Sequence, residues 1–187
     1  DYEGIADGGQ AETVGGVIYY PVRANGWGTL MFEDLWPAYG DYDFNDLVLN
    51  YKIQLYMNNK NMVDAMLIGI RVKAVGGSIP YDIYLRMTGV RGGQIDEVEP
   101  YFAPTEYGRA AYERLREGNT NIDGADYYYS NDGLVWGINI PADVQHAYEN
   151  VDFLKAYPGF ARWARSGGAT DTDWYLHGVS ENLVDKR

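Results

Sequence analysis

Apolar and polar residues alternate along residues 46–55, a period of two that is typical of a β-strand with one apolar face. Residues 58–61 (NNKN) then give a turn signal, and a second alternating run extends from Met62 to Val75. The two runs predict an antiparallel hairpin. The apolar positions are Leu47, Leu49, Tyr51, Ile53 and Leu55 in the first run and Met66, Ile68, Ile70 and Val72 in the second.

Shorter β-type runs predict further strands at residues 17–20, 29–34, 81–87 and 134–140. Helix-forming residues predict a short helix over 105–117. Large apolar residues at helical spacing over 153–163 predict a second helical element, interrupted at Pro158.

These elements predict a mainly β fold, an antiparallel β-sandwich of jelly-roll-like type with one or two short helices. Residues 1–16 are acidic and rich in glycine and are expected to form a flexible lead-in. Residues 17–187 are expected to form a single β-sandwich domain, which is long enough to bury a substantial core.

The segment 40–48 (GDYDFNDLV) carries four oxygen-bearing side chains within six residues, between two predicted strands. Oxygen donors at this density, without sulfur or histidine, are what a hard cation such as Ca²⁺ prefers. The preceding strand ends in two further carboxylates, which the hairpin could bring alongside. The candidate metal ligands are therefore Glu33, Asp34, Asp41, Asp43, Asn45 and Asp46.

The spacing of this segment begins like an EF-hand loop, with oxygen donors at relative positions 1, 3 and 5. However, Asp46 stands where that loop needs glycine, and Lys52 stands where it needs glutamate. An EF-hand is therefore excluded, which leaves a Ca²⁺ loop on a β scaffold. If the loop is extended, Asp41, Asp43 and Asn45 point the same way.

A polar turn, in which Asp and Asn side chains cap backbone N–H groups, is the alternative interpretation of these residues. Five carboxylates converging on one end of a hairpin would repel one another without a counter-ion. This favours a metal site, with Ca²⁺ preferred over Mg²⁺ or Mn²⁺.

The segments 32–37 (FEDLWP) and 40–48 resemble the signature of the LruC domain family. A second match to the same family, in the same order along the chain, is given by residues 136–141 (WGINIP), 160–168 (FARWARSGG) and 173–175 (DWY). The resemblance therefore spans residues 29–175. Residues 105–123 fit the family pattern poorly and resemble an insertion. The resemblance implies a secreted or surface-anchored protein of Bacteroidetes and other Gram-negative bacteria, many of which carry a lipoprotein signal. It implies no established molecular function.

Composition narrows the function classes. The net charge of −12 argues against nucleic-acid binding, and the absence of cysteine excludes disulfides, zinc–thiolate sites and cysteine nucleophiles. No run of 18 apolar residues predicts a membrane span. The sequence shows no signal peptide, and a removed signal or lipid anchor outside this chain would leave no trace in it. The expected location is extracellular, at the bacterial outer-membrane surface or in the periplasm.

Catalysis is not expected, because carboxylates that chelate a cation are held ionised and cannot act as acids. His146 and His177 stand apart in the sequence, and no nucleophile or phosphate-loop motif occurs. A Ca²⁺-dependent hydrolase remains a weaker alternative, which would need a carboxylate pair outside the metal's coordination shell.

Tyrosine and tryptophan are abundant, with 18 Tyr and five Trp, and several lie in predicted turns, where flat rings suit sugar faces or protein interfaces. Trp27, Tyr39 and Tyr42 are the candidate ligand-binding residues, whereas Trp136, Trp163 and Trp174 are expected in the core. The sequence thus predicts a non-catalytic calcium-binding cell-surface module that binds a surface glycan or a protein. The alternative is a purely structural, Ca²⁺-stabilised domain of a larger surface protein.

Overall fold

The computed structural model describes residues 12–14, 16–21, 26–34, 40–77, 91–95 and 137–185. The chain divides into two units, one formed by Asp1–Ile79 with Tyr127–Arg187 and the other by Pro80–Asp126. In the second unit the described residues contain one 3₁₀ turn, η1 (Gly92–Gln94). The predicted strand at 81–87, the predicted helix at 105–117 and Trp136 lie outside the described residues.

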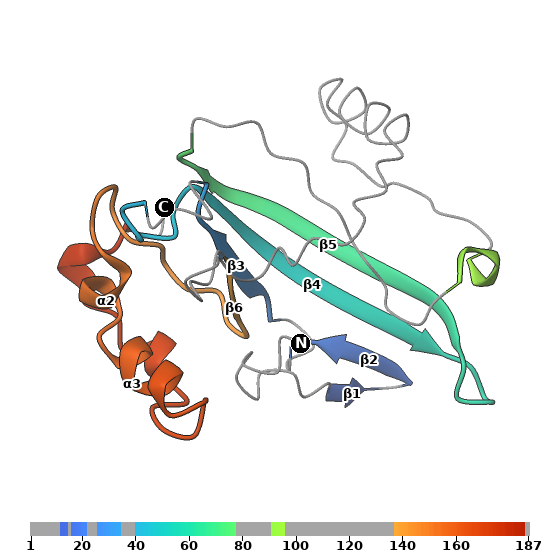
Figure 1. The fold of residues 1–187 in the computed structure, drawn as a ribbon. Coiled ribbons are helices and arrows are strands. Elements are labelled where there is room, and N and C mark those ends of the chain that lie inside the picture. Colours follow the sequence, from blue (N-terminus) through green and yellow to red (C-terminus); the bar gives the residue numbers. More distant parts are fainter. Residues whose placement is uncertain are drawn as a thin grey trace. The chain divides into compact units, whose positions relative to one another are not determined.

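The first unit is built on an antiparallel sheet whose long central strand is β4 (Figure 1). One edge of β4 pairs first with β3 and then with β2, and its other edge pairs with β5 along its whole length. β1 and β6 extend the sheet beyond β2 and β3. The strands are β1 (Glu12–Val14), β2 (Val17–Tyr20), β3 (Gly28–Phe32), β4 (Leu47–Met57), β5 (Val63–Val75) and β6 (Gly137–Ile140).

The β4–β5 hairpin follows the alternating pattern that predicted it. Its turn is closed by the Asn58 side chain, whose Oδ1 accepts the backbone N–H groups of Lys60 and Met62 at 2.9 and 3.0 Å. Asn61 has a positive φ of 56°, a conformation that asparagine tolerates better than most residues. The described residues confirm the predicted fold class. The fold is mainly β, antiparallel and sandwich-like, with two short helices among these residues. β1 lies inside the segment assigned to a lead-in, and the domain boundary stays a prediction.

The helical spacing near the C-terminus corresponds to α2 (Phe153–Ala156) and α3 (Gly159–Arg165), which are separated at Pro158 as expected. Asp152 caps α2 by accepting the Leu154 N–H at 2.8 Å. Two 3₁₀ turns follow, η2 (Trp174–Leu176) and η3 (Ser180–Asn182). No helix among the described residues is long and apolar enough to cross a membrane.

The hydrophobic core joins the β3–β4–β6 part of the sheet to this C-terminal segment. Phe153 is fully buried and packs edge-to-face against Phe160 and Trp174, with ring centres 5.1 and 5.8 Å apart. Trp174 is in the core and Trp163 packs against it, as predicted. The core comprises Met31, Phe44, Val48, Ile138, Ile140, Val144, Ala147, Phe153, Ala156, Tyr157, Phe160, Trp174 and Leu183.

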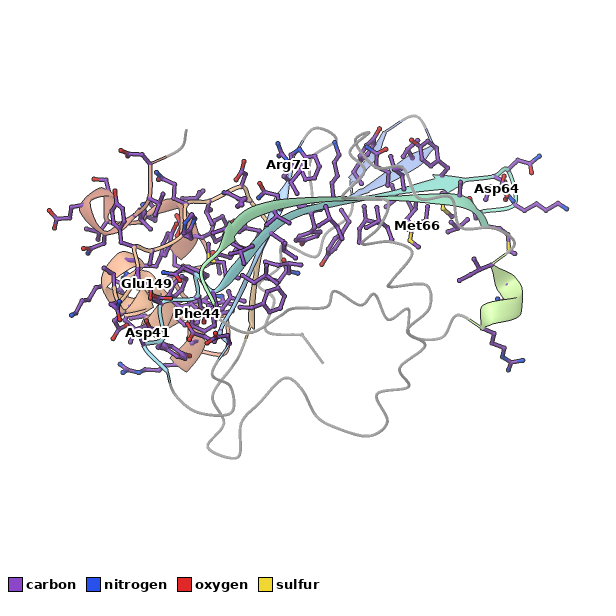
Figure 2. All side chains as sticks on the ribbon, turned by 90° about the horizontal axis from the view of Figure 1, so that it is seen from above. Asp41, Phe44, Asp64, Met66, Arg71 and Glu149 are labelled. Carbon is purple, nitrogen blue, oxygen red and sulfur yellow. The ribbon has the colours of Figure 1, made fainter. Side chains whose placement is uncertain are left out.

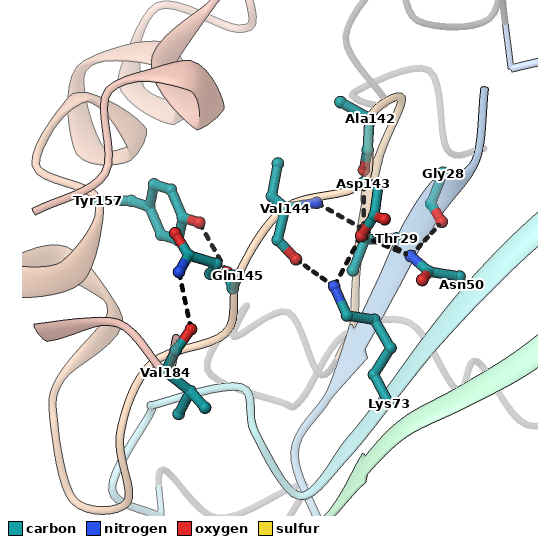
Figure 3. Close-up of polar contacts among 10 residues, drawn as sticks. All are labelled: Gly28, Thr29, Asn50, Lys73, Ala142, Asp143, Val144, Gln145, Tyr157 and Val184. Carbon is teal, nitrogen blue, oxygen red and sulfur yellow. Dashed lines mark hydrogen bonds and ion pairs between the residues drawn. The ribbon is translucent and has the colours of Figure 1, made fainter. Parts of the chain in front are cut away.

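A polar network fixes the loop after β6 onto the sheet (Figure 3). The Lys73 ammonium group of β5 contacts the Asp143 carboxylate at 2.7 Å and the Val144 carbonyl at 2.6 Å. The Asn50 amide of β4 donates to Asp143 and to the Thr29 hydroxyl group, both at 3.2 Å. Three neighbouring strands therefore hold the start of the C-terminal segment in place.

Candidate metal centre

The acidic loop connects β3 to β4 and adopts an unusual backbone. Gly40, Tyr42 and Phe44 all have positive φ values, of 61°, 57° and 56°, although two of them are bulky aromatic residues. Such conformations carry strain for side chains of this size and occur often at ligand-binding sites. The left-handed residues alternate with Asp41 and Asp43, so the loop is not extended.

Three carboxylates converge at this loop: Glu33, Asp41 and Asp43 each offer an oxygen, and these oxygens lie within 4.8 Å of one another. Glu33 immediately follows β3, and the β3–β4 pairing brings it beside the loop. Glu33 and Asp43 are only 6% and 1% exposed, whereas Asp41 is exposed to solvent. The arrangement is thus two buried carboxylates with one at the surface.

Backbone N–H groups donate hydrogen bonds to both buried carboxylates, but one carboxylate oxygen of Glu33 receives none. Glu33 Oε1 accepts the N–H of Phe44, while Glu33 Oε2 is buried and has no hydrogen-bond partner. Asp43 Oδ1 accepts the Asn45 N–H at 3.1 Å, and Asp43 Oδ2 accepts the Asn150 N–H at 2.8 Å. A buried carboxylate oxygen without a donor is costly, and a cation at this position would satisfy it.

The electrostatic environment of these carboxylates disfavours their ionised forms. Burial raises the pKa of Glu33 to about 7, against the opposing effect of the Phe44 N–H, and the charges of Asp46, Asp43 and Asp41 raise it further. Burial also raises the pKa of Asp43 to about 7, with smaller contributions from neighbouring carboxylates. The charges acting on Glu33 are all negative, which is the situation that a bound cation would relieve.

Asp34, Asn45 and Asp46 lie beside the three converging carboxylates and hold the loop in shape. The Asp34 N–H donates to Asp46 Oδ2 at 2.7 Å, which ties the end of β3 to the start of β4. The Asn45 side-chain amide donates to Asp43 Oδ2 at 2.8 Å, and its own oxygen faces Gly76, where an added Cβ would come within 3.0 Å. Burial raises the pKa of Asp46.

The predicted aromatic ligand-binding residues lie in different surroundings. Tyr42 is half-buried and packs edge-to-face on Phe44, with ring centres 4.7 Å apart. Trp27 is also half-buried and lies under the Arg71 guanidinium group, 3.9 Å from its ring centre. Tyr39 lies outside the described residues.

Two residues that the sequence did not single out reach this site from the C-terminal segment. Asn150 supplies the N–H that Asp43 accepts, and Glu149 contributes a negative charge that acts on both Asp43 and Asp46. Asn150 has a φ of 61° and ends a short turn after Tyr148, but nothing in that local sequence identifies its partner 107 residues away.

Oxygen donors alone, two of them buried and one at the surface, can hold a hard divalent cation. The set lacks nitrogen and sulfur ligands, so it does not match the preferences of zinc or copper. Glu33, Asp41 and Asp43 are therefore the described residues that could hold such a cation, with backbone carbonyls and water completing its coordination shell.

Comparisons with known proteins place the chain in a family. Residues 72–175 match the family described as "Domain of unknown function (DUF4842)", and the chain belongs to that family. The match includes Glu149 and Asn150 but begins after the acidic loop. No curated protein matches the chain.

A solved structure shares the fold. It is a protein described as a "putative lipoprotein" from Bacteroides ovatus, with a TM-score of 0.56 and 19% sequence identity. The alignment covers 91% of this chain and 77% of the Bacteroides chain. At this level of identity the similarity concerns the fold.

Proposed function

We propose that this chain is a non-catalytic, calcium-binding module of the bacterial cell surface, in which Ca²⁺ stabilises the junction between the sheet and the acidic loop. The observation that carries this proposal is the convergence of Glu33, Asp41 and Asp43, one of which has a buried oxygen, Glu33 Oε2, without a hydrogen-bond partner. Bringing ionised carboxylates together in a buried site is unfavourable, and a bound cation would neutralise them.

Ca²⁺ is preferred over Mg²⁺ because the donors are held by an irregular loop and come from separate parts of the chain. Ca²⁺ accepts six to eight oxygens in variable geometry, whereas Mg²⁺ requires near-octahedral geometry and keeps several waters. The Tyr42 ring beside the site is half-buried and packs against Phe44 and the core, so it is not presented to an external ligand. This supports a stabilising role for the ion.

The cell-surface location is supported by two similarities. The motifs around residues 32–48 and 136–175 resemble the LruC family of secreted and surface-anchored proteins. The Bacteroides ovatus protein with the same fold is itself described as a "putative lipoprotein". We infer that the chain works outside the cytoplasm, at the outer-membrane surface or in the periplasm.

Thermal melting tests the metal site. Wild-type protein in EDTA, then with excess Ca²⁺ or Mg²⁺, should show a melting temperature that rises by about 5–10 °C at a Ca²⁺ concentration of 100 times Kd, and less with Mg²⁺. Asp43→Asn should lose this response. Glu181→Gln, which changes an exposed carboxylate on η3, should keep it. An unchanged wild-type melting temperature across all conditions would refute the proposal.

A second candidate function is glycan binding on one face of the sheet. Residues directly opposite one another on neighbouring strands share a face. The pairs Tyr19↔Gln54 and Arg71↔Asn50 therefore place Tyr19 and Arg71 on the same face, together with Tyr56 of β4. Tyr56 is 40% exposed, so this face carries accessible aromatic surface.

Trp27 adds a stacking surface to this face, because its ring lies against Gly69 and under Arg71. Aromatic rings combined with a cation suit the sugar faces and carboxylates of an acidic polysaccharide. On a glycan array we expect binding to acidic glycans that Trp27→Ala abolishes and Tyr148→Ala, at an exposed tyrosine of the C-terminal segment, leaves intact. If the wild-type protein binds no glycan on the array, this second function is wrong.

A further inference from the structure

The acidic loop is in contact with a part of the chain that lies more than 100 residues away. The Asn150 N–H donates to Asp43 Oδ2 at 2.8 Å, and the Phe153 N–H donates to the Tyr42 carbonyl at 2.9 Å. The rings of Phe44 and Phe153 pack edge-to-face with centres 5.2 Å apart. The loop is therefore a bridge between the sheet and the C-terminal helical segment.

Glu149 stands at this contact with its side chain exposed. It immediately precedes Asn150, so its backbone is next to the N–H group that Asp43 accepts. Figure 2 shows Asp41, Phe44 and Glu149 gathered at one end of the β4–β5 hairpin, with Asp64 and Met66 at the other. The Asn150 side-chain amide contacts Glu149 Oε1 at a long distance, 3.5 Å.

The negative charge of Glu149 acts on the carboxylates of the acidic loop. It is among the carboxylates that raise the pKa of Asp43 and of Asp46. An additional negative charge here weakens the metal-free fold, since like charges repel. The same charge strengthens the binding of a cation, because Ca²⁺ affinity rises with the number of charged ligands.

We propose that Glu149 closes the calcium site from the C-terminal segment, so that one ion joins the acidic loop to that segment. This inference rests on the proposed calcium-binding function and adds a ligand to it. The Asn150 N–H already holds the backbone next to Glu149 against Asp43, so only the exposed Glu149 side chain would have to turn for its carboxylate to join this site. The ion then controls how firmly α2 and its flanking turns are docked on the sheet.

The test compares the full wild-type chain with Glu149→Gln and with the matched control Glu181→Gln. Calorimetric titration with Ca²⁺ should give a Kd about tenfold higher for Glu149→Gln and an unchanged Kd for the control. In EDTA, Glu149→Gln should melt at the same temperature as wild type or above it, because it removes a repulsive charge. The melting temperature in EDTA thus distinguishes the loss of a calcium ligand from damage to the fold.

Hydrogen exchange gives the second measurement. Ca²⁺ should slow exchange at the Asn150 and Phe153 amides in wild type, and slow it less in Glu149→Gln. If wild type binds Ca²⁺ and Glu149→Gln binds it equally well, the role of Glu149 is refuted while the calcium site stands. If wild type binds no Ca²⁺, both proposals fail.

Discussion

Thr29 is a fully buried strand residue whose hydroxyl group joins β3 to the loop that follows β6. Its Oγ1 donates to the Ala142 carbonyl at 2.7 Å and accepts the Val144 N–H at 3.1 Å. The Asn50 amide donates to the same oxygen at 3.2 Å. One hydroxyl group thus uses its whole hydrogen-bonding capacity, one donor and two acceptor positions, on buried or partly buried partners.

Replacing Thr29 by valine keeps the shape of the side chain but removes all three hydrogen bonds. We expect the free energy of unfolding in urea to fall by about 1–3 kcal/mol, because buried partners are left unsatisfied. Thr29→Ser keeps the hydroxyl group and should retain most of the stability, apart from the loss of one methyl group. A Thr29→Val protein as stable as wild type would mean that the hydrogen bonds contribute nothing, and a Thr29→Ser protein as unstable as Thr29→Val would mean that the methyl group contributes as much as they do.

Sequence reasoning identified the carboxylates of the candidate site but not Thr29. Asp41 and Asp43 stand out because acidic residues are concentrated there, and Glu33 follows from the β3–β4 hairpin. A threonine in a strand is unremarkable by itself, because its branched side chain favours strands anyway. Its role depends on Ala142 and Val144, which are more than 110 residues away.

Among the elements, the β4–β5 hairpin was predictable because alternation over more than ten residues is hard to mistake. The alternation does not predict which face of the hairpin is covered by other parts of the chain. Ile70 and Val72 of the expected apolar face are 48% and 59% exposed, so the pattern identifies the strand without identifying its neighbours.

The acidic loop shows a similar limit at the level of local conformation. An extended loop would align Asp41, Asp43 and Asn45, but the structure uses left-handed residues at Tyr42 and Phe44. Asp41 and Asp43 converge nevertheless, and Asn45 becomes a hydrogen-bond donor to Asp43. Bulky residues rarely adopt this conformation, so no sequence rule would have predicted it.

The helical spacing near the C-terminus was also readable, but the place where that segment docks was not. Phe153 was recognised as one of a set of large apolar residues at helical intervals. Its packing on Phe44 and its backbone bond to Tyr42 depend on tertiary structure alone. The contact between the two segments is therefore the part of the candidate site that only the fold reveals.

For the whole molecule, the net charge of −12 means that repulsion among carboxylates affects stability throughout the chain. The acidic site concentrates this repulsion in buried surroundings. In the absence of a cation, the folded protein can relieve it only by taking up protons. This links stability to pH, with a sign that depends on whether Ca²⁺ is present.

In EDTA the protein should become less stable as pH rises. The pKa values of Glu33 and Asp43 are raised to about 7 in the folded state from ordinary values of 4.5 and 3.8. The folded state therefore binds more protons than the unfolded state between about pH 4 and pH 7, and the free energy of unfolding falls across this window. Urea unfolding at pH 5.5 and pH 8 measures the change. Ca²⁺ binds the ionised carboxylates, so its stabilising effect should be larger at pH 8.

Glu33→Gln provides the control, because it removes one of the two titrating groups while keeping the size of the side chain. Its stability in EDTA should depend less on pH than that of wild type. The difference between the two proteins isolates the acidic site from His146, whose pKa burial lowers and which destabilises the fold as pH falls below about 6.5. If wild type and Glu33→Gln lose stability in parallel between pH 5.5 and pH 8, Glu33 does not titrate in this window. The repulsion that a cation is proposed to relieve would then have to arise elsewhere in the loop.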